Sequence, residues 1–254
     1  MNYTDKEIIE EFRKRVTPDH ELNQLYQLVN DFNNLCNLVE LEYFCDGGSL
    51  LGAVKFGTII RYDDDADFIY IKNEENQKKL EIIFDLMKQL GNRVFYQIAT
   101  GGYQIVPIGQ YYPFIDIIPL YKKKKTYYLP KIIRNNPKFI VKKFTHHDLY
   151  PRKKIKYGDL TLWTMNNYKD YLDKSYPNWK KLSVYMGSHS FNSAIEVAAD
   201  YAKTHWTIET KKLPEEISKF TNYKLKYDTL KKLEFNPHKP VRRVDQLNWL
   251  RINI

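Results

Sequence analysis

Apolar residues along the first third of the chain follow first a helical and then a strand periodicity. From Pro18-Asp19 to Cys36 they recur every three or four positions, which predicts an amphipathic helix packed on a core. The short apolar run Glu42–Cys45 predicts a strand, and the glycine pair that follows it predicts a tight turn into a short helix. Asp67–Ile71 is rich in aromatic and β-branched residues and therefore predicts a buried strand.

The middle of the chain adds a longer helix and three more strands. Asn73 suits the N-cap of a helix with one apolar face, and Gly91 is placed to end that helix. Gly101-Gly102 predicts a hairpin turn between two of the strands. The three predicted strands span Arg93–Thr100, Tyr103–Pro107 and Phe114–Leu120. Because the helix lies among mostly antiparallel or mixed strands, the predicted fold class is α+β.

The pattern divides the chain into three parts that we expect to form one compact unit. Residues 1–40 would supply helices packed on the core, residues 41–165 the α+β core, and residues 166–254 a mainly helical C-terminal annex. The helices predicted in the annex include 192–203 and 224–233.

A dense acidic cluster leads into the Asp67–Ile71 strand. Carboxylates occupy four of five consecutive positions, at Asp63, Asp64, Asp65 and Asp67. Two unit charges about 5 Å apart repel by roughly 3 kcal/mol at an effective dielectric near 20, so we expect a cation among them. Side chains two apart in a strand share a face, so Asp65 and Asp67 would together clamp one hard cation. Mg²⁺ combines a few carboxylates with phosphate oxygens, which makes a nucleotide or another pyrophosphate its natural partner.

Two further features point to the same site. Gly47, Gly48 and Ser49 precede a predicted helix, where glycine lets backbone approach a ligand and the helix start attracts phosphate. Such a motif by itself can be a plain turn, but beside an acidic cluster it favours a phosphate site. Asp116 lies within an apolar run, where an unpaired buried carboxylate costs several kcal/mol. A nearby Lys or Arg could pair with it, whereas a strand next to the aspartate strand would bring it to the same metal.

These motifs stand in a specific order along the chain: Gly47–Lys55, Ile59–Asp67 and Phe114–Leu120. Together with the later segments Tyr150–Gly158 and Asn167–Leu172, they resemble the LicD family, which includes fukutin and fukutin-related protein. The match spans roughly Leu41 to Pro177. The resemblance implies a nucleotidyltransferase-like mixed sheet flanked by helices, with residues 41–165 as the catalytic core. It also implies transfer of phosphocholine or a polyol phosphate, such as ribitol phosphate, from a CDP-linked donor to a glycan or glycolipid.

The resemblance also implies roles for individual residues. Asp65 and Asp67 would be the catalytic metal-binding pair for Mg²⁺ or Mn²⁺, with Asp116 as the third carboxylate, completing the metal site or accepting a proton. Asp63 is an additional candidate ligand, while Asp63 and Asp64 could also be supporting or solvated groups. The candidates for binding the donor are Gly47, Gly48, Ser49, Lys55, Arg152 and Lys154. Lys55 stands where the family usually has arginine, and Tyr62 where it usually has tryptophan; lysine lacks the two-pronged grip on phosphate.

Composition excludes some classes of protein and leaves others open. The net charge of +9, from 40 Lys+Arg against 31 Asp+Glu, favours anionic partners without identifying one. Basic runs such as Lys122–Lys125 are separated by aromatics, so nucleic acid is considered, but a solvated basic surface is favoured. The start lacks the order of a signal peptide and no stretch is apolar enough to span a bilayer, so we expect a soluble, cytoplasmic protein. Cys36 and Cys45 are expected to be reduced core residues.

Two alternatives to phospho-alcohol transfer remain open from the sequence. The same site could transfer a nucleoside monophosphate from an NTP to an acceptor, or the fold could serve as a non-catalytic nucleotide- or nucleic-acid-binding protein. His146-His147-Asp148 could bind a transition metal, but adjacent side chains in an extended segment diverge, which favours a surface or hydrogen-bonding role. No Ser-His-Asp or Cys-His signature indicates nucleophilic catalysis.

Overall fold

The computed structural model describes residues 17–60, 63–137, 139–176 and 179–180, together with the backbone of 182–185 and 195–198. Its centre is a nine-stranded mixed sheet. The strands are β1 (Tyr43–Cys45), β2 (Asp65–Lys72), β3 (Asn92–Gln97), β4 (Gly102–Pro107), β5 (Phe114–Lys123), β6 (Thr126–Tyr128), β7 (Lys143–Thr145), β8 (Lys153–Tyr157) and β9 (Leu160–Thr164). Their order is β3-β4-β5-β2-β1-β9-β8, with β6 pairing with β5 and β7 with β6. The β2–β5 and β1–β9 pairs are parallel and the others antiparallel, which confirms the mixed sheet of an α+β fold.

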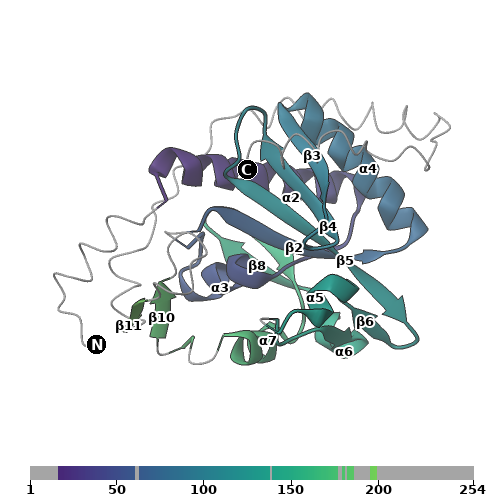
Figure 1. Cartoon of the computed structure of the whole chain (residues 1–254), viewed down its shortest axis with the longest axis vertical. Coiled ribbons are helices and arrows are strands. Elements are labelled where there is room, and N and C mark those ends of the chain that lie inside the picture. Colours follow the sequence, from purple (N-terminus) through teal and green to yellow (C-terminus); the bar gives the residue numbers. More distant parts are fainter. Residues whose placement is uncertain are drawn as a thin grey trace.

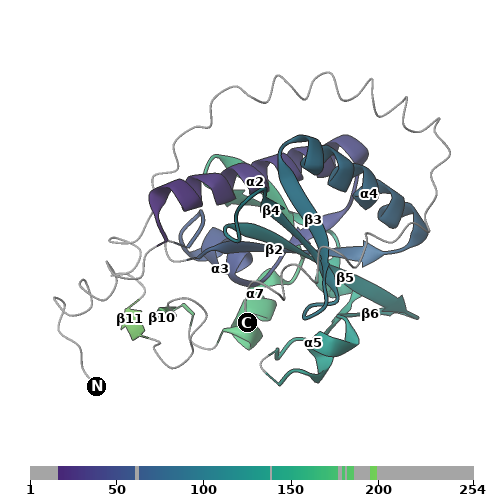
Figure 2. The same cartoon turned by 45° about the horizontal axis from the view of Figure 1, so that its top comes forward.

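Helices cover both sides of this sheet (Figure 1). α2 (Asp19–Val39) and α4 (Glu74–Gln89) lie on one side, and α3 (Gly47–Lys55), α5 (Lys131–Asn135) and α7 (Tyr168–Ser175) lie on the other. Figure 2 shows the same two groups from another direction. The N-terminal helix predicted from Asp19 and the helix predicted after Asn73 are both confirmed.

The apolar face of α2 packs directly behind the aspartate strand. Phe32 of α2 lies 4.9 Å from Phe68 of β2 and 5.6 Å from Tyr43 of β1, measured between ring centroids. All three side chains are fully buried, and their tilted and edge-on contacts bury large apolar area. This packing holds β1 and β2 rigidly, so the residues on the opposite face of β2 have a firm base.

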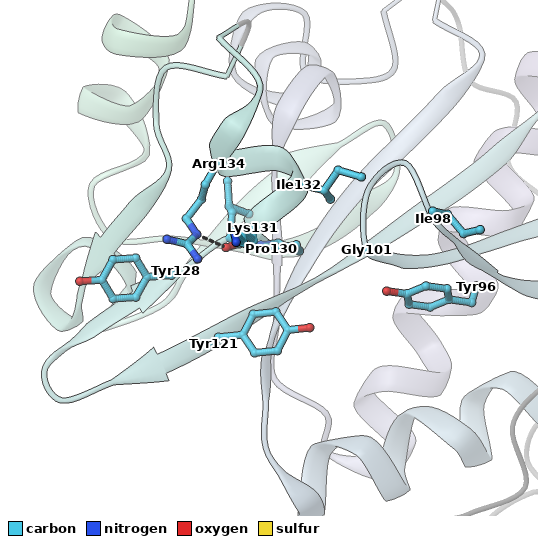
Figure 3. Close-up of a pocket in the computed structure, with 10 residues that line it drawn as sticks. Tyr96, Ile98, Gly101, Tyr121, Tyr128, Pro130, Lys131, Ile132 and Arg134 are labelled. Carbon is cyan, nitrogen blue, oxygen red and sulfur yellow. Dashed lines mark hydrogen bonds between the residues drawn. The ribbon is translucent and has the colours of Figure 1, made fainter.

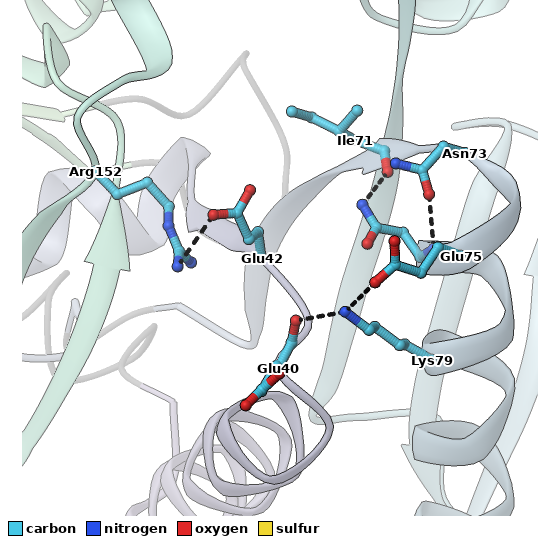
Figure 4. A network of polar contacts seen from close by, with 8 residues as sticks. Glu40, Glu42, Ile71, Asn73, Glu75, Lys79 and Arg152 are labelled. Atoms are coloured by element: carbon cyan, nitrogen blue, oxygen red, sulfur yellow. Dashed lines mark hydrogen bonds and ion pairs between the residues drawn. The ribbon is translucent and has the colours of Figure 1, made fainter. Parts of the chain in front are cut away.

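α4 begins and ends as its sequence predicts. The side chain of Asn73 accepts a hydrogen bond from the backbone N–H of Asn76 at 2.7 Å, and Gly91 follows the helix with a φ of 85°. Lys79 of α4 donates to the carbonyl of Glu40 at 3.0 Å and pairs with Glu75, as Figure 4 shows. This bridge ties the start of α4 to the end of α2.

Two predicted elements differ from the structure: the strand from Arg93 and the helix over 192–203. The strand predicted from Arg93 to Thr100 ends at Gln97, because the chain turns there and Gly102 already belongs to β4. A Cβ at Gly102 would overlap the carbonyl of Ile117 on β5, so glycine lets these two strands approach closely.

The C-terminal prediction of helix over 192–203 is wrong at Ile195–Ala198, which forms strand β11 antiparallel to β10 (Leu182–Tyr185). Its Ile-Glu-Val-Ala sequence is too short and apolar for its pattern to distinguish a helix from a strand, and its two β-branched residues suit the strand. The helix predicted over 224–233 lies outside the described residues, whereas α7 agrees with the expected helical character after Asn166.

The segment His146-His147-Asp148 belongs to a short capped helix. α6 (His146–Leu149) starts with a capping box in which the Asp148 carboxylate accepts from the backbone N–H of Thr145 at 2.7 Å. The ring of His146 stacks on Tyr150 at 4.7 Å. Cys36 and Cys45 are free and buried, as predicted. Within the described part of the chain, we find no helix with the length and apolar character needed to cross a membrane.

Candidate active site

Three carboxylates meet where β2 and β5 run side by side. In the parallel register of these strands, Asp67 lies opposite Asp116 and Asp65 lies opposite Phe114. Asp65, Asp67 and Asp116 can each offer one oxygen so that all three atoms lie within 4.8 Å of one another. Strand alternation puts Asp65 and Asp67 on one face, and the parallel neighbour adds Asp116 to that face. The expected three-carboxylate arrangement is therefore present.

A second acidic group shares one member with the first. Asp63, Asp64 and Asp65 also offer oxygens within 4.8 Å of one another, so Asp65 belongs to both groups. Burial, followed by the nearby charge of Asp67, raises the pKa of Asp63 to about 8. Asp63 thus lies close to Asp67 rather than in open solvent. Asp64 belongs to the group of Asp63, Asp64 and Asp65.

Asp67 is the most crowded carboxylate of the site. Burial raises its pKa well above the ordinary value, and the charges of Asp65, Asp116 and Asp46 raise it further. The opposing influence is a hydrogen bond of 3.2 Å that Asp67 Oδ2 accepts from the backbone N–H of Gly48. One backbone donor cannot balance three neighbouring negative charges.

The glycine motif forms the first turn of α3 and lies directly against Asp67. Gly47 has a φ of 54°, and a Cβ at this position would overlap the Asp67 carboxylate. A Cβ at Gly48 would lie 3.0 Å from Asp63 Oδ2. Ser49 is buried, and its hydroxyl accepts a hydrogen bond from the backbone N–H of Asp67 at 2.9 Å. The glycines thus let a helix N-terminus approach the carboxylates, while the Ser49 hydroxyl holds α3 to β2.

Asp46 joins the site although the sequence did not single it out. It is the N-cap residue of α3, is 7% exposed, and donates its backbone N–H to the carbonyl of Asp67 at 3.0 Å. Burial raises the pKa of Asp46, against the effect of a hydrogen bond from the Tyr171 hydroxyl. Within the described residues, Asp46 Oδ1 is buried without a hydrogen-bond partner. Its position directly before the glycine pair was the available signal.

Two other groups complete the surroundings of the carboxylates. Gln104 of β4 lies opposite Asp116 in the sheet, and its side-chain amide donates to Asp116 Oδ1 at 3.1 Å. Tyr176, just after α7, is partly buried; its pKa is raised first by burial and then by the charges of Asp67 and Asp46. No spacing in the sequence connects these residues with the aspartates, because only the sheet order and the return of α7 bring them together.

This donor set fits a hard divalent cation. Carboxylate oxygens cluster from Asp65, Asp67 and Asp116, and the orphaned buried oxygen of Asp46 adds negative charge beside Asp67. Without a cation these carboxylates repel one another. This repulsion from Asp65, Asp116 and Asp46 adds to the effect of burial in raising the pKa of Asp67. Oxygen-only ligand sets of this kind suit Mg²⁺ or Mn²⁺.

Lys55 lies away from the glycine turn. It occupies the last turn of α3, eight residues after Gly47, which is about 12 Å along a helix axis. Its ammonium donates to the carbonyl of Trp179 at 2.7 Å, and burial lowers the pKa of Lys55 to about 8. The role of Lys55 toward a donor phosphate stays a prediction.

Arg152 and Lys154 both lie over the ring of Trp163. Their cationic groups are 4.6 Å and 5.2 Å from its centroid, respectively. Arg152 also forms an ion pair with Glu42 at 3.5 Å, as seen in Figure 4. The structure thus brings these two residues together next to β1, and their assignment to donor binding stays a prediction.

The metal-free protein should lose stability as pH rises. The raised pKa values of Asp46, Asp63 and Asp67 mean that the folded chain holds protons that the unfolded chain, with carboxyl pKa values of 3.8, has released. The free energy of unfolding therefore falls with increasing pH, for Asp63 between about 4 and about 8. We expect a lower melting temperature at pH 8 than at pH 6 in EDTA, and a smaller difference in Asp63→Asn. A melting temperature that stays level or rises over this range would contradict the electrostatic description of the site.

Solved structures with partial similarity include ANT(2")-Ia and a lincosamide antibiotic adenylyltransferase. ANT(2")-Ia in complex with adenylyl-2"-tobramycin aligns with a TM-score of 0.39 and 17% identity, covering 59% of this chain and 78% of that one. The lincosamide antibiotic adenylyltransferase LnuA, bound to lincomycin, aligns with a TM-score of 0.38 and 15% identity, covering 62% of this chain and 85% of that one.

Curated relatives include two uncharacterized rickettsial proteins. One, from Rickettsia prowazekii (strain Madrid E), is 31% identical over 168 residues, which cover 66% of this chain and 59% of the relative. The other, from Rickettsia typhi (strain ATCC VR-144 / Wilmington), is 29% identical over 180 residues, which cover 71% of this chain and 54% of the relative. The chain thus matches little more than half the length of either protein.

The family model described as LicD/FKTN/FKRP, nucleotidyltransferase domain, matches residues 40–167. This range contains the glycine turn, both strands of the carboxylate site and the Trp163 region, and it amounts to half of the chain. The protein is therefore a member of the LicD/FKTN/FKRP family, with its nucleotidyltransferase domain at residues 40–167.

Proposed function

We propose that this protein is a divalent-metal-dependent transferase that moves a phospho-alcohol group from a CDP-linked donor to a glycan hydroxyl. The observation that carries the proposal is the parallel pairing of Asp67 with Asp116, beside the glycine start of α3. Family membership supports transfer of phosphate-containing groups. The region 41–165 would be the catalytic core, and α7 would close one side of it.

The chain's own residues would divide the work as follows. Asp65, Asp67 and Asp116 would hold Mg²⁺ or Mn²⁺, and when bound the cation would neutralise negative charge on the donor pyrophosphate. Gln104 would orient Asp116 through its hydrogen bond to Oδ1. Because Gly47 has no side chain, the Asp67 carboxylate can lie against the start of α3, so a donor phosphate held at the carboxylates would also lie near this helix start.

The test is a comparison of donors with the intact chain. We expect CMP to be released from CDP-choline, CDP-ribitol or CDP-glycerol in the presence of Mg²⁺ and a glycan acceptor, with the phospho-alcohol recovered on the acceptor. The same donor should raise the melting temperature of the protein more than CMP plus the free alcohol does, because one ligand then spans the site. Donor-induced stabilisation and CMP release should both require the divalent cation.

Other outcomes would point to different chemistry. Release of pyrophosphate from an NTP, with label from its α-phosphate on the acceptor, would replace the proposal by nucleotidyl transfer. Nucleotide binding without turnover of any donor would indicate a binding protein. Transfer that continues unchanged in excess EDTA would contradict the role assigned to the carboxylates.

A further inference from the structure

An open cavity lies on the described surface between the β3–β4 turn and α5, away from the carboxylate cluster. Its volume is about 480 Å³. Figure 3 shows Tyr96 and Ile98 on one side and Tyr128, Arg134 and Lys131 on the other. A Cβ at Gly101 would meet Pro130 at 2.9 Å and Ile132 at 3.6 Å, so the hairpin turn and α5 form one continuous wall.

Cations surround the tyrosines of this cavity. Arg134 lies over the ring of Tyr128 at 5.5 Å, and its Nε donates to the carbonyl of Leu129 at 3.0 Å. Lys72 lies over the ring of Tyr121 at 5.4 Å. Because the Arg134 side chain is held by both contacts, its remaining N–H groups are already oriented before an anion arrives.

The β5–β6 hairpin continues the same surface. Tyr121 pairs with Tyr128 and Lys123 pairs with Thr126, so strand alternation puts these four residues on one face. Lys123 therefore extends the basic border of the cavity toward the hairpin tip, where Lys124 and Lys125 follow.

The surrounding sequence has a single sign of charge. Residues 117–147, which we call the basic segment, contain no Asp or Glu. Its cationic residues among those that the structure describes are Lys122, Lys123, Lys124, Lys125, Lys131, Arg134, Lys142 and Lys143. None of the described residues that line the cavity is acidic either. A surface of this kind attracts polyanions or an anionic bilayer.

Exposed aliphatic side chains distinguish between these partners. Ile98 is 58% exposed and Ile132 is 46% exposed at the edges of the cavity, and Phe139 and Ile140 of the basic segment are also exposed. Neither a nucleic-acid backbone nor a sugar polymer gains by burying isoleucine, whereas an interfacial protein gains by placing apolar side chains below the headgroups and cations at their level. Tyrosine is likewise favoured at the headgroup level.

We propose that the cavity and the basic segment dock on an anionic membrane surface, with one anionic lipid headgroup between Lys131 and Arg134. These two residues are three apart on α5 and therefore share a face. Ile98 and Ile132 would enter the interface beside that headgroup. The inference is independent of the reaction proposed above, because it uses none of the carboxylates.

Vesicle sedimentation with the full chain tests this proposal. We expect strong binding to vesicles of phosphatidylcholine mixed with one third phosphatidylglycerol, and little binding to phosphatidylcholine alone. The Lys131→Glu, Arg134→Glu variant should bind the anionic vesicles at least about 30-fold more weakly. The matched control is Lys156→Glu, Lys169→Glu, which reverses two exposed lysines of β8 and α7 and should bind nearly as the unmodified chain does.

The apolar contribution is tested separately. Ile98→Ser, Ile132→Ser should retain binding at low salt but lose most of it at roughly twice physiological salt, where charge attraction is screened. Asp67→Asn should bind vesicles normally, so a loss of transfer and a loss of docking are distinguishable. Circular dichroism and melting curves check that each variant is folded.

Three outcomes would overturn the proposal. Equal loss in both double charge reversals would mean that only net charge matters. Unchanged binding of the isoleucine variant at elevated salt would remove the interfacial role of the cavity. Tight binding of a single-stranded oligonucleotide that is lost in Lys131→Glu, Arg134→Glu, together with no binding to anionic vesicles, would assign the surface to nucleic acid.

Discussion

Asp67→Asn is expected to reduce the proposed phospho-alcohol transfer by about 10³-fold, which corresponds to a loss of about 4 kcal/mol in transition-state stabilisation. Asp67 lies between Asp65, Asp116 and Asp46, whose charges all raise its pKa. Asparagine keeps the shape of the side chain but removes the charge that a divalent cation needs. The measurement is initial-rate transfer from the active CDP-alcohol at saturating Mg²⁺.

The same variant should make the metal-free protein more stable. Replacing Asp67 removes repulsion with its acidic neighbours, so the melting temperature in EDTA should rise by a few degrees at pH 8 and by less at pH 5. Asp159→Asn is the matched control, since Asp159 is exposed on the turn between β8 and β9. Lower activity together with lower metal-free stability in Asp67→Asn would indicate a structural role instead.

Gly47→Ala should damage both stability and activity. Its φ of 54° is unfavourable for alanine, and the new Cβ would overlap the Asp67 carboxylate. We expect a loss of about 2–4 kcal/mol in the free energy of unfolding, from the backbone and the overlap together. Displacement of Asp67 should also lower transfer by about 10²-fold. Urea unfolding and initial rates measure the two effects.

Gly91→Ala separates the backbone contribution from the overlap. Gly91 has a φ of 85°, and a Cβ there would meet nothing within 4 Å. We therefore expect a loss of about 1–2 kcal/mol in stability and no change in transfer rate. If Gly47→Ala were no worse than Gly91→Ala in either measurement, close approach of the glycine turn to Asp67 would not matter for function.

Local patterns were sufficient for the regular elements between Asp19 and Leu120, whereas the strands and short helices from β6 to β9 had no such prediction. The helical spacing from Asp19 onward, the Asn73 cap and the aromatic and β-branched run Asp67–Ile71 all reflect interactions between residues close in sequence. The same local rule failed at Ile195–Ala198, where a short apolar segment fits a helix or a strand. Strand β10 provides the partner that makes this segment a strand.

The candidate site was predictable where one strand supplies it. Asp65 and Asp67 share a face because they are two apart, and the location of Asp116 in an apolar run indicated a central strand. Gln104 and Tyr171 had no such signal. They reach the carboxylates through strand order and through the return of the chain after β9.

The cationic candidates illustrate the same difference. Lys55, Arg152 and Lys154 follow from the resemblance to the family, but their surroundings depend on which segments fold back on them. Lys55 meets the carbonyl of Trp179, and Arg152 meets Glu42 and Trp163. The contacts of Lys55 with Trp179 and of Arg152 with Glu42 could not be inferred from spacing, because more than a hundred residues separate the two members of each pair.

The amino-acid sequence alone determined the helix and strand periods, the acidic cluster and its glycine turn, and the family to which the chain is similar. Only the tertiary structure decided that Asp116 lies opposite Asp67, that Asp46 is buried beside them, and that a tyrosine cavity lies next to the basic segment. The physical reason is the sequence separation over which each interaction acts. Side-chain periodicity and helix capping involve residues only a few positions apart. Strand register, burial and charge repulsion depend on which distant segments share a sheet face.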